Sequence, residues 1–419
     1  MSGNREHQTD WFETRGQAGP QVICHVDMDC FYAACERLRE PALRGQPLVV
    51  GMGYEPGTTN GAVATASYEA RAFGVESAEA ISAALEKLPR KIDAVDDPSM
   101  DVEEAGFYRP VDLDFYDEVA SEVKDILHDE AETVREVSID EAYLDITDRV
   151  GWEDDPEMFA RRVRERIDDE VGVTASVGVA PTMSAAKVAS DHDKPDGLVV
   201  VEPGEVRRFL APLDVEDVHG IGPVTAAELR EMGVRTAGDL AAADPSVLGE
   251  KFGERGREVH RYARGEDDRT VTPKGEPKSL SRESAFTEPT ADSERKRERI
   301  RLLAADVAER ASREGALYRT IGVKVVVPPF DVNTRARSLP GPVEDADLVE
   351  AVALELLGEF ADERVRKLGV RVSNLSFADG DQTSLTGFDA DGEAEGASDD
   401  RSTPEAGDSA GQRSLTDFE

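Results

Sequence analysis

Two adjacent carboxylates, Asp140 and Glu141, lie between two short β-type runs, residues 133–139 and 142–147. Neighbouring side chains of one straight strand point to opposite faces, so these two acids converge only if the chain turns between the runs. A hairpin turn there would present two anionic groups at one edge of a sheet. Because hard divalent cations prefer carboxylate oxygens as ligands, the pair predicts a metal site.

A third acid has a similar position. Residues 22–26 have the pattern of a buried strand, and Asp27 and Asp29 follow it. Three carboxylates at strand ends can hold two metal ions about 3.5–4 Å apart, which stabilises the attacking and leaving oxygens of phosphoryl transfer. In a chain with 88 Asp and Glu, a lone acid after a strand is more often a solvated loop residue. We expect Asp29 to cap the helix that begins near Cys30.

Three segments resemble the motifs of one family. His25–Ala33 (HVDMDCFYA) and Ser138–Asp145 (SIDEAYLD) look like the two catalytic motifs of Y-family, DinB-type translesion DNA polymerases. Ala62–Val75 (AVATASYEARAFGV) resembles their fingers motif, and the motifs occur in the expected order. The resemblance implies a template-directed, low-fidelity DNA polymerase of DNA damage tolerance and repair, with primer-template DNA and dNTPs as partners.

The same resemblance implies a metal-binding set. Asp27, Asp140 and Glu141 would be the catalytic acids and would bind two Mg²⁺ ions. The Met28 carbonyl would be a further, backbone ligand.

Four residues match positions that contact the incoming nucleotide in the family. Tyr68, Arg71 and Lys194 correspond to residues that bind the triphosphate, and Lys194 lies in a segment that resembles the family's A-x-K-P-x-G. Tyr32 matches the steric gate, an aromatic ring that packs against the sugar and excludes a 2′-hydroxyl. Without the resemblance, the first three would be assigned to the surface and Tyr32 to a helix core.

Residues 218–226 (VHGIGPVTA) form a helix-hairpin-helix signature, with Gly220 and Gly222 in the turn. The N–H groups of the following helix can bind a DNA phosphate without reading sequence. An ordinary packing unit of two helices is the alternative. Residues 253–265 resemble a second, weaker hairpin.

These patterns predict a right-hand polymerase of the α/β (α+β) class, with a ferredoxin-like palm, small fingers, a helical thumb and a β/α little finger. The expected divisions are a loose leader (1–20), palm (21–29 and 93–201, with an acidic insertion at 93–106 that reads as a surface loop), fingers (30–92), thumb (202–270), linker (271–277), little finger (278–377) and a disordered acidic tail (378–419).

The net charge of −39 at first argues against nucleic-acid binding. The chain has 11 Lys against 38 Arg and acids throughout, a composition that resembles proteins of extreme halophiles. In molar salt the Debye length is about 3 Å, so self-repulsion is screened. Residues 278–376 hold 17 basic and 17 acidic residues, so this segment is neutral and suits DNA better than the rest. We therefore expect a haloarchaeal protein.

The sequence predicts the cellular compartment of the protein through the absence of membrane and secretion signals. No apolar run reaches the ~18 residues of a membrane span, and the N-terminus has no signal-peptide core. Cys24, Cys30 and Cys35 read as buried thiols in a reducing compartment. We expect a cytoplasmic monomer that does not bind membranes.

Two segments of the acidic tail fit Q-x-x-L-x-x-F, the pattern of peptides that dock on the DNA sliding clamp. A single helical turn would bring Leu and Phe to one side. The predicted clamp-binding residues are Gln382, Leu385, Phe388, Gln412, Leu415 and Phe418.

Two alternatives remain open. A palm-type nucleotidyl cyclase would use a similar sheet and metal carboxylates, although the helix-hairpin-helix and clamp peptides disfavour it. A catalytically inactive DNA-binding scaffold is disfavoured by the presence of all three acids. The segment Glu76–Ala80 departs from the family pattern, which puts the local template contacts in doubt but not the metal site.

Overall fold

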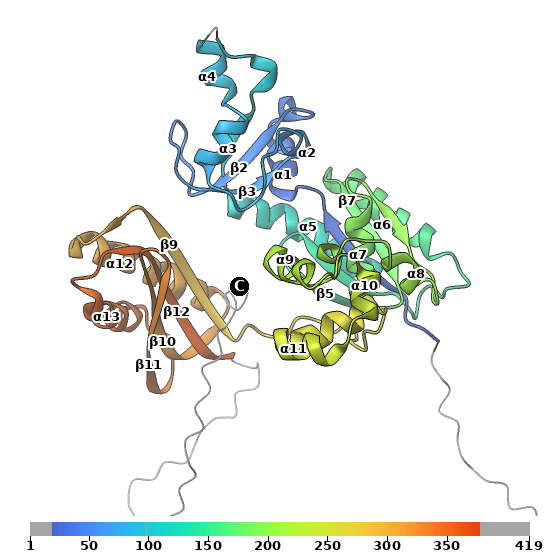
Figure 1. The fold of residues 1–419 in the computed structure, drawn as a ribbon. Coiled ribbons are helices and arrows are strands. Elements are labelled where there is room, and N and C mark those ends of the chain that lie inside the picture. Colours follow the sequence, from blue (N-terminus) through green and yellow to red (C-terminus); the bar gives the residue numbers. More distant parts are fainter. Residues whose placement is uncertain (1–18, 98, 378–419) are drawn as a thin grey trace, which may run out of the picture. The chain divides into compact units, whose positions relative to one another are not determined.

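The computed structural model describes residues 19–97 and 99–377. The chain divides into two compact units between Lys274 and Gly275 (Figure 1). Each unit has its own hydrophobic core. Among the described helices, none is long and apolar enough to cross a membrane. Residues 1–18 and the two clamp-type peptides lie outside the described residues.

The first unit contains a mixed sheet of five strands in the order β5-β6-β1-β7-β8. Their bounds are β1 Ile23–Met28, β5 Thr133–Glu136, β6 Glu141–Asp145, β7 Ala175–Ala180 and β8 Leu198–Val200. All six residues of β1 are buried, as expected of a central strand that is covered on both faces. β1 pairs antiparallel with β6 and with β7, which come from distant parts of the chain, and this sheet is the predicted palm.

Helices cover both faces of the palm sheet. α5 (Leu113–Glu130) and α6 (Pro156–Val171) pack in one core with alternate residues of β1 and β6. α7 (Met183–His192) packs in a second core with Ile23 and Tyr143 from the opposite face. The alternation of β1 residues between the two cores places α7 beside the strand that carries Asp27.

A smaller sheet carries the fingers motif. β2 (Leu48–Met52) pairs antiparallel with β3 (Ala62–Ala66) and parallel with β4 (Phe107–Pro110). The helical segments that accompany it are α1 Phe31–Arg39, η1 Pro41–Leu43, α2 Tyr68–Arg71, α3 Ile81–Lys87, α4 Lys91–Asp96 and η2 Val102–Glu104. Cys24 and Cys35 are buried, Cys30 is half-buried, and all three are free thiols.

The structure differs from two sequence predictions in this region. Residues 93–106 are not simply an acidic surface loop, because α4 and η2 lie partly or wholly within them. β4 pairs with β2, so residues 107–110 join the fingers sheet and not the palm. The acidic segment buries only small apolar side chains such as Ala94 and Ala105, which leaves a hydrophobic periodicity too weak to reveal its helices.

Short helices follow the palm and complete the first unit. They are α8 Val206–Leu210, η3 Val215–Asp217, α9 Pro223–Glu231, α10 Ala237–Ala242 and α11 Pro245–Ala263. Their apolar residues share a core with α7. α11 is interrupted at Gly253, whose φ of 64° is non-helical, at the start of the segment predicted to be a second hairpin.

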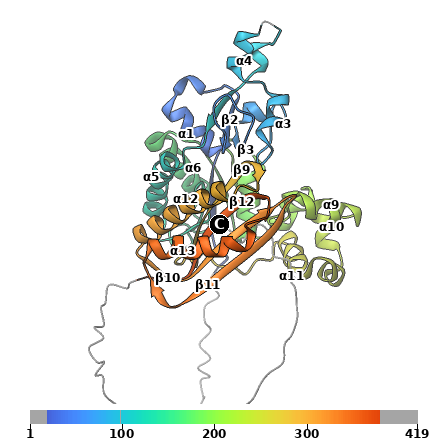
Figure 2. The same ribbon diagram turned by 90° about the vertical axis from the view of Figure 1, so that its left-hand side faces the viewer.

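The second unit is a four-stranded antiparallel sheet in the order β11-β10-β12-β9, with two long helices packed against it (Figure 2). Its elements are β9 Ser279–Thr290, α12 Ser293–Arg313, β10 Ala316–Val327, β11 Asp331–Val343, α13 Ala346–Leu357, η4 Gly358–Phe360 and β12 Val365–Phe377. Ile321, Val323 and Val325 of β10 belong to the core with the helices. Lys324, between them, therefore lies on the opposite face of the sheet.

Candidate active site

The three predicted acids meet at one edge of the palm sheet. Asp27 of β1 stands directly opposite Glu141 of β6 in the antiparallel ladder. Asp140 precedes β6, and its carbonyl accepts a 2.9 Å hydrogen bond from the backbone N–H of Met28. The chain does turn between β5 and β6, so the condition for bringing Asp140 and Glu141 together is met.

Ser138 organises that turn. Its hydroxyl donates to the Asp140 carboxylate at 2.5 Å and accepts from the backbone N–H groups of Asp140 (3.3 Å) and Glu141 (3.1 Å). Burial, together with the nearby charges of Asp27 and Glu141, raises the pKa of Asp140 although the Ser138 hydrogen bond opposes this. Repulsion among close carboxylates is relieved when a cation binds between them.

Two lysines occupy the space between the acids. The Lys187 ammonium lies 2.7 Å from an Asp27 oxygen and 2.8 Å from a Glu141 oxygen. The Lys194 ammonium lies 2.6 Å from the other Asp27 oxygen, and both lysines also contact Asp191. Sequence reasoning assigned Lys194 but missed Lys187. Its signal was a lysine only seven residues before Lys194 in a chain with only 11 lysines.

A glycine allows α7 to carry Lys187 to this position. A Cβ on Gly178 of β7 would lie 2.2 Å from the Ala186 carbonyl oxygen and 2.3 Å from the Ser190 backbone nitrogen. Any larger residue would push α7 away from the sheet. The close approach of helix and sheet therefore requires a glycine at this position.

Electrostatics keep two of the acids ionised. Burial alone would raise the pKa of Asp27, but Lys187 and Lys194 outweigh burial and lower it. Burial likewise opposes ionisation of Glu141, yet the neighbouring His25 and Lys187 lower its pKa to about 2. Asp27 and Asp191 outweigh burial and raise the pKa of both lysines, and Glu141 adds to the effect on Lys187.

His25 and Ser190 form a second layer behind Glu141, which the sequence analysis did not assign. His25 is fully buried in β1, and its Nε2 lies 3.4 Å from a Glu141 oxygen. Its Nδ1 is 2.8 Å from the Ser190 hydroxyl. Burial lowers the pKa of His25 despite the nearby acids, so the imidazole beside Glu141 is neutral.

The donor set suits a divalent cation. Within residues 19–97 and 99–377, no three acid, histidine or cysteine side chains are arranged as a ready metal cluster. Lys187 bridges Asp27 and Glu141, while Ser138 holds Asp140. The ammonium shows that one cation can contact both carboxylates at once. Carboxylate oxygens are the donors that Mg²⁺ takes.

Asp29 does not cap a helix, contrary to the sequence prediction. The N-cap of α1 is Cys30, in the left-handed conformation with φ of 46° and with no side-chain capping bond. The Asp29 carboxylate instead accepts from the Ser176 hydroxyl, the Tyr68 hydroxyl and the Asp196 backbone N–H. Burial raises its pKa, although these hydrogen bonds oppose the rise. Tertiary partners thus outcompete the local N–H groups.

The predicted nucleotide contacts lie on α1, α2 and the loop after α7. Tyr32 of α1 stacks on Tyr116, with ring centroids 4.7 Å apart and an interplanar angle of 22°. The Arg71 guanidinium lies 4.9 Å from the Tyr68 ring centroid, and its Nε donates to the Ala66 carbonyl at 3.0 Å. Tyr68 and Lys194 are linked to the palm through Asp29 and Asp27.

The predicted DNA-binding hairpin precedes α9. Gly222 is the N-cap of α9, and Gly220 has a φ of 84°, a conformation that favours glycine. A Cβ on Gly220 would collide with the Arg255 guanidinium, which donates to the Gly220 carbonyl at 2.9 Å. The sequence analysis missed Arg255, a cation held beside the predicted phosphate site.

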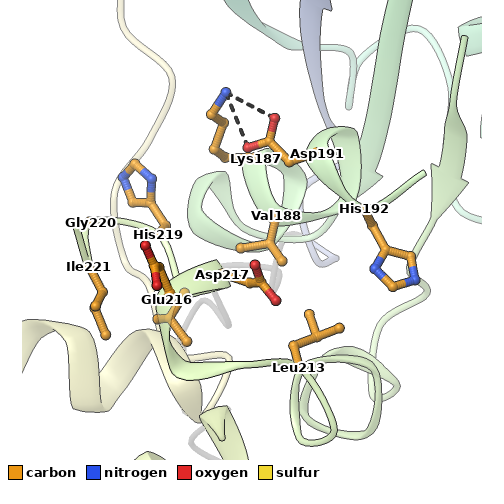
Figure 3. Close-up of a pocket in the computed structure, with 11 residues that line it drawn as sticks. Lys187, Val188, Asp191, His192, Leu213, Glu216, Asp217, His219, Gly220 and Ile221 are labelled. Atoms are coloured by element: carbon orange, nitrogen blue, oxygen red, sulfur yellow. Dashed lines mark hydrogen bonds and ion pairs between the residues drawn. The ribbon is translucent and has the colours of Figure 1, made fainter. Parts of the chain in front are cut away.

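A cavity of about 360 Å³ lies between α7 and this hairpin (Figure 3). Lys187, Asp191 and His192 line it from α7, and His219 and Gly220 line it from the hairpin. Burial and nearby arginines lower the pKa of His219 to about 4, so it is neutral at pH 7. The helix that carries Lys187 and the hairpin thus share one hollow.

Comparisons with known proteins agree along the chain. The model of the impB/mucB/samB family matches residues 26–191, its C-terminal-domain model matches 277–385, and the IMS family HHH motif matches 203–234. A protein named DNA polymerase IV from Halobacterium salinarum is 62% identical over 376 residues, 90% of each chain. Another of that name from Methanoculleus marisnigri is 40% identical, covering 88% of this chain and 99% of its own.

Solved structures give the same assignment. A Y-family DNA polymerase chimera of Dbh and Dpo4 superposes with a TM-score of 0.71 at 28% identity, over 85% of this chain and 100% of that one. An insertion ternary complex of Dbh DNA polymerase has a TM-score of 0.61 at 26% identity, with the same coverage. The chain therefore belongs to the impB/mucB/samB family of Y-family DNA polymerases.

Proposed function

We infer that the protein is a template-directed DNA polymerase of the translesion type, which adds dNTPs to a primer 3′-hydroxyl on damaged and undamaged templates. The meeting of Asp27, Asp140 and Glu141 at one edge of the palm sheet, in a chain of this family, is the observation that supports this most. The relatives named DNA polymerase IV support the same activity.

The primer 3′-oxygen forms a bond to the α-phosphorus of the dNTP, the bond to pyrophosphate breaks, and the hydroxyl proton is lost to water. Two bound Mg²⁺ ions would lower the pKa of the hydroxyl and neutralise triphosphate charge. Asp27, Asp140 and Glu141 would hold them, together with the Met28 carbonyl. His25 would pack beside the Glu141 carboxylate.

The lysines have a second task in this proposal. Ammonium groups and metal ions compete for the same oxygens, so Lys187 and Lys194 would release Asp27 as metal binds. Lys194 would then turn to the triphosphate, where Tyr68 and Arg71 also donate hydrogen bonds. A compact ammonium and a planar guanidinium both suit phosphate oxygens.

Primer extension tests the activity directly. The assay would use undamaged, abasic and alkylated templates with Mg²⁺ in molar KCl, because the acidic composition suits high salt. We expect extension past the lesions. Formation of cyclic nucleotide without extension would identify a cyclase, and DNA binding without either product would identify a scaffold.

Tyr32 would exclude ribonucleotides. Its ring is held by stacking on Tyr116, so it presents a fixed surface to the sugar. Tyr32→Ala should admit rNTPs while dNTP incorporation continues, measured as the ratio of the two kcat/KM values. An unchanged ratio would contradict the steric-gate role.

The acidic tail would tether the enzyme to a sliding clamp through residues 382–388 and 412–418. Phosphate contacts weaken steeply in salt, whereas a tether raises the effective concentration of the enzyme without DNA contacts. Deletion of residues 379–419 should lower processivity only when clamp is present, with unchanged single-nucleotide incorporation. Equal processivity of both proteins on clamp-loaded DNA would refute the tether.

A further inference from the structure

Asp29 is a buried carboxylate that joins three separate segments of the first unit. It lies one residue beyond β1 and is 6% exposed. The Ser176 hydroxyl of β7 lies 3.0 Å from both of its oxygens, and the Tyr68 hydroxyl donates to Oδ1 at 3.2 Å. The backbone N–H of Asp196 donates to Oδ2 at 2.8 Å. Strand, fingers helix and palm loop thus meet at one side chain.

More than one hydrogen bond holds the palm loop that contains Asp196. Asp196 has a φ of 55°, in the left-handed region that residues other than glycine adopt mainly where tertiary contacts hold them. Its N–H is held by Asp29 and its carboxylate by Arg164. The next amide, of Gly197, donates to the Ser176 hydroxyl at 3.0 Å. Asp29 and Ser176 therefore fix two consecutive amides of the loop that follows Lys194.

We propose that Asp29 is a positioning residue for nucleotide binding: it sets the Tyr68 hydroxyl and the loop of Lys194 in register with each other, and it is not a metal ligand. The inference rests on the proposed triphosphate contacts of Tyr68 and Lys194. Both oxygens of Asp29 are already engaged by donors from elements other than those that carry Asp140 and Glu141. Asp27, two residues earlier, contacts the two lysines instead.

Because of these contacts, two substitutions of Asp29 should differ in the hydrogen bonds that they retain. Asp29→Asn keeps one oxygen for the Asp196 N–H, and its amide can donate to the hydroxyls of Tyr68 and Ser176, which are able to accept. Asp29→Ala leaves the Asp196 N–H and both hydroxyls without their acceptor. A metal ligand would respond differently, because an amide is a poor replacement for an anionic carboxylate.

The experiment measures single-nucleotide incorporation in molar KCl, with kcat, KM for dNTP and the Mg²⁺ midpoint determined for each variant. We expect Asp29→Ala to raise KM about 5- to 100-fold, the factor expected for buried donors left unsatisfied, with the Mg²⁺ midpoint unchanged. Asp29→Asn should stay within about threefold of wild type because its bonds are retained. Combining Asp29→Ala with Tyr68→Phe should raise KM by less than the product of the single effects.

Loss of kcat and a shifted Mg²⁺ midpoint in Asp29→Asn, as expected for Asp27→Asn, would overturn the proposal by making Asp29 a metal ligand. An unchanged KM in a folded Asp29→Ala protein would also overturn it. If that variant does not fold by circular dichroism, Ser176→Ala replaces it, and an unchanged KM there has the same meaning. The single variants Tyr68→Phe and Lys194→Ala distinguish a failure of the proposed triphosphate contacts from a failure of the proposed role of Asp29. If neither raises KM, the proposed triphosphate contacts fail, and the inference fails with them.

Discussion

Acids and lysines meet on both large sheets of the molecule, but with opposite balance. In the palm, the ammonium groups of Lys187 and Lys194 contact three carboxylates, which leaves a formal surplus of one negative charge. These carboxylates belong to Asp27, Glu141 and Asp191. The nearby Asp140 adds a further carboxylate beside Asp27 and Glu141. The lysines come from α7 and the loop that follows it, so they can move without disturbing the strands that carry the acids.

In the second unit, one carboxylate, Glu283 of β9, is paired with two lysines. Lys324 of β10 lies 2.9 Å away, and Lys367 of β12 forms a second ion pair. Burial opposes ionisation of Glu283, but the two lysines lower its pKa. This cluster has a formal surplus of one positive charge on the sheet face opposite α12 and α13. A surplus of carboxylates suits cations and a surplus of lysines suits phosphates, so we expect the two clusters to favour different ligands.

The largest effect should come from the palm acids. Asp140→Asn or Glu141→Gln should reduce nucleotide incorporation roughly 10³-fold or more, because each removes a charged metal donor. DNA affinity, measured by fluorescence anisotropy, should be nearly unchanged. Glu136→Gln is the matched control, since it makes the same chemical change on the same sheet but in an ion pair with Lys124. Normal turnover in either palm variant would remove the metal assignment.

Removal of the bridging lysine should expose the surplus of negative charge. Lys187→Met should lower the free energy of unfolding by about 1–3 kcal/mol without divalent cation, because Asp27 and Glu141 lose their shared partner. Added Mg²⁺ should stabilise this variant more than the wild type, as measured by thermal unfolding at several Mg²⁺ concentrations. Lys124→Met, at a more exposed pair, is the control. Equal Mg²⁺ dependence in wild type and Lys187→Met would argue against competition for the carboxylates.

The ion pair of Asp267 and Arg269, with one carboxylate and one cation, lies between these two cases in charge balance. Asp267 is buried and accepts from the Ser184 backbone N–H at 2.9 Å and from Arg269 at 2.8 Å. Burial opposes its ionisation, yet Arg269 and the Ser184 amide lower its pKa below the ordinary value of 3.8. Its contribution to stability is therefore complete above pH 3.8 and is lost as pH falls through the lowered folded-state pKa.

Asp267→Asn should consequently destabilise the protein by about 1 kcal/mol at neutral pH, and the difference from wild type should narrow below pH 4. Urea unfolding across this pH range measures it. Exposed Asp268→Asn is the neighbouring control. A difference that stays constant with pH would show that the ionised form of Asp267 contributes nothing.

The smallest effect should come from Glu283. Glu283→Gln should raise DNA affinity up to about fivefold, because a pair of this kind contributes up to about 1 kcal/mol. The dependence of log affinity on log salt should also steepen as the freed lysines meet phosphates. Glu314→Gln, beside Arg310 at the end of α12, is the control. If both variants bind DNA alike, the face of the sheet with Lys324 and Lys367 does not contact DNA.

Much of the site followed from sequence. Apolar runs in the sequence predict buried strands. Asp27, Asp140 and Glu141 were predicted as a group because they lie at the ends of such runs. The helix-hairpin-helix was equally visible, because two glycines before a proline mark a tight turn followed by the start of a helix. The α4 segment was not visible as a helix, because its buried residues are few and small.

What the sequence by itself determined is therefore the set of elements and the acids at their ends, because hydrophobic periodicity and turn chemistry are local properties. The tertiary structure alone decided which cations face those acids. Lys187 reaches Asp27 and Glu141 only because Gly178 lets α7 approach the sheet. Asp29 binds Tyr68 and Asp196 instead of capping a helix, because these residues approach it from distant segments. Such pairings depend on distances between parts of the chain that no local pattern specifies.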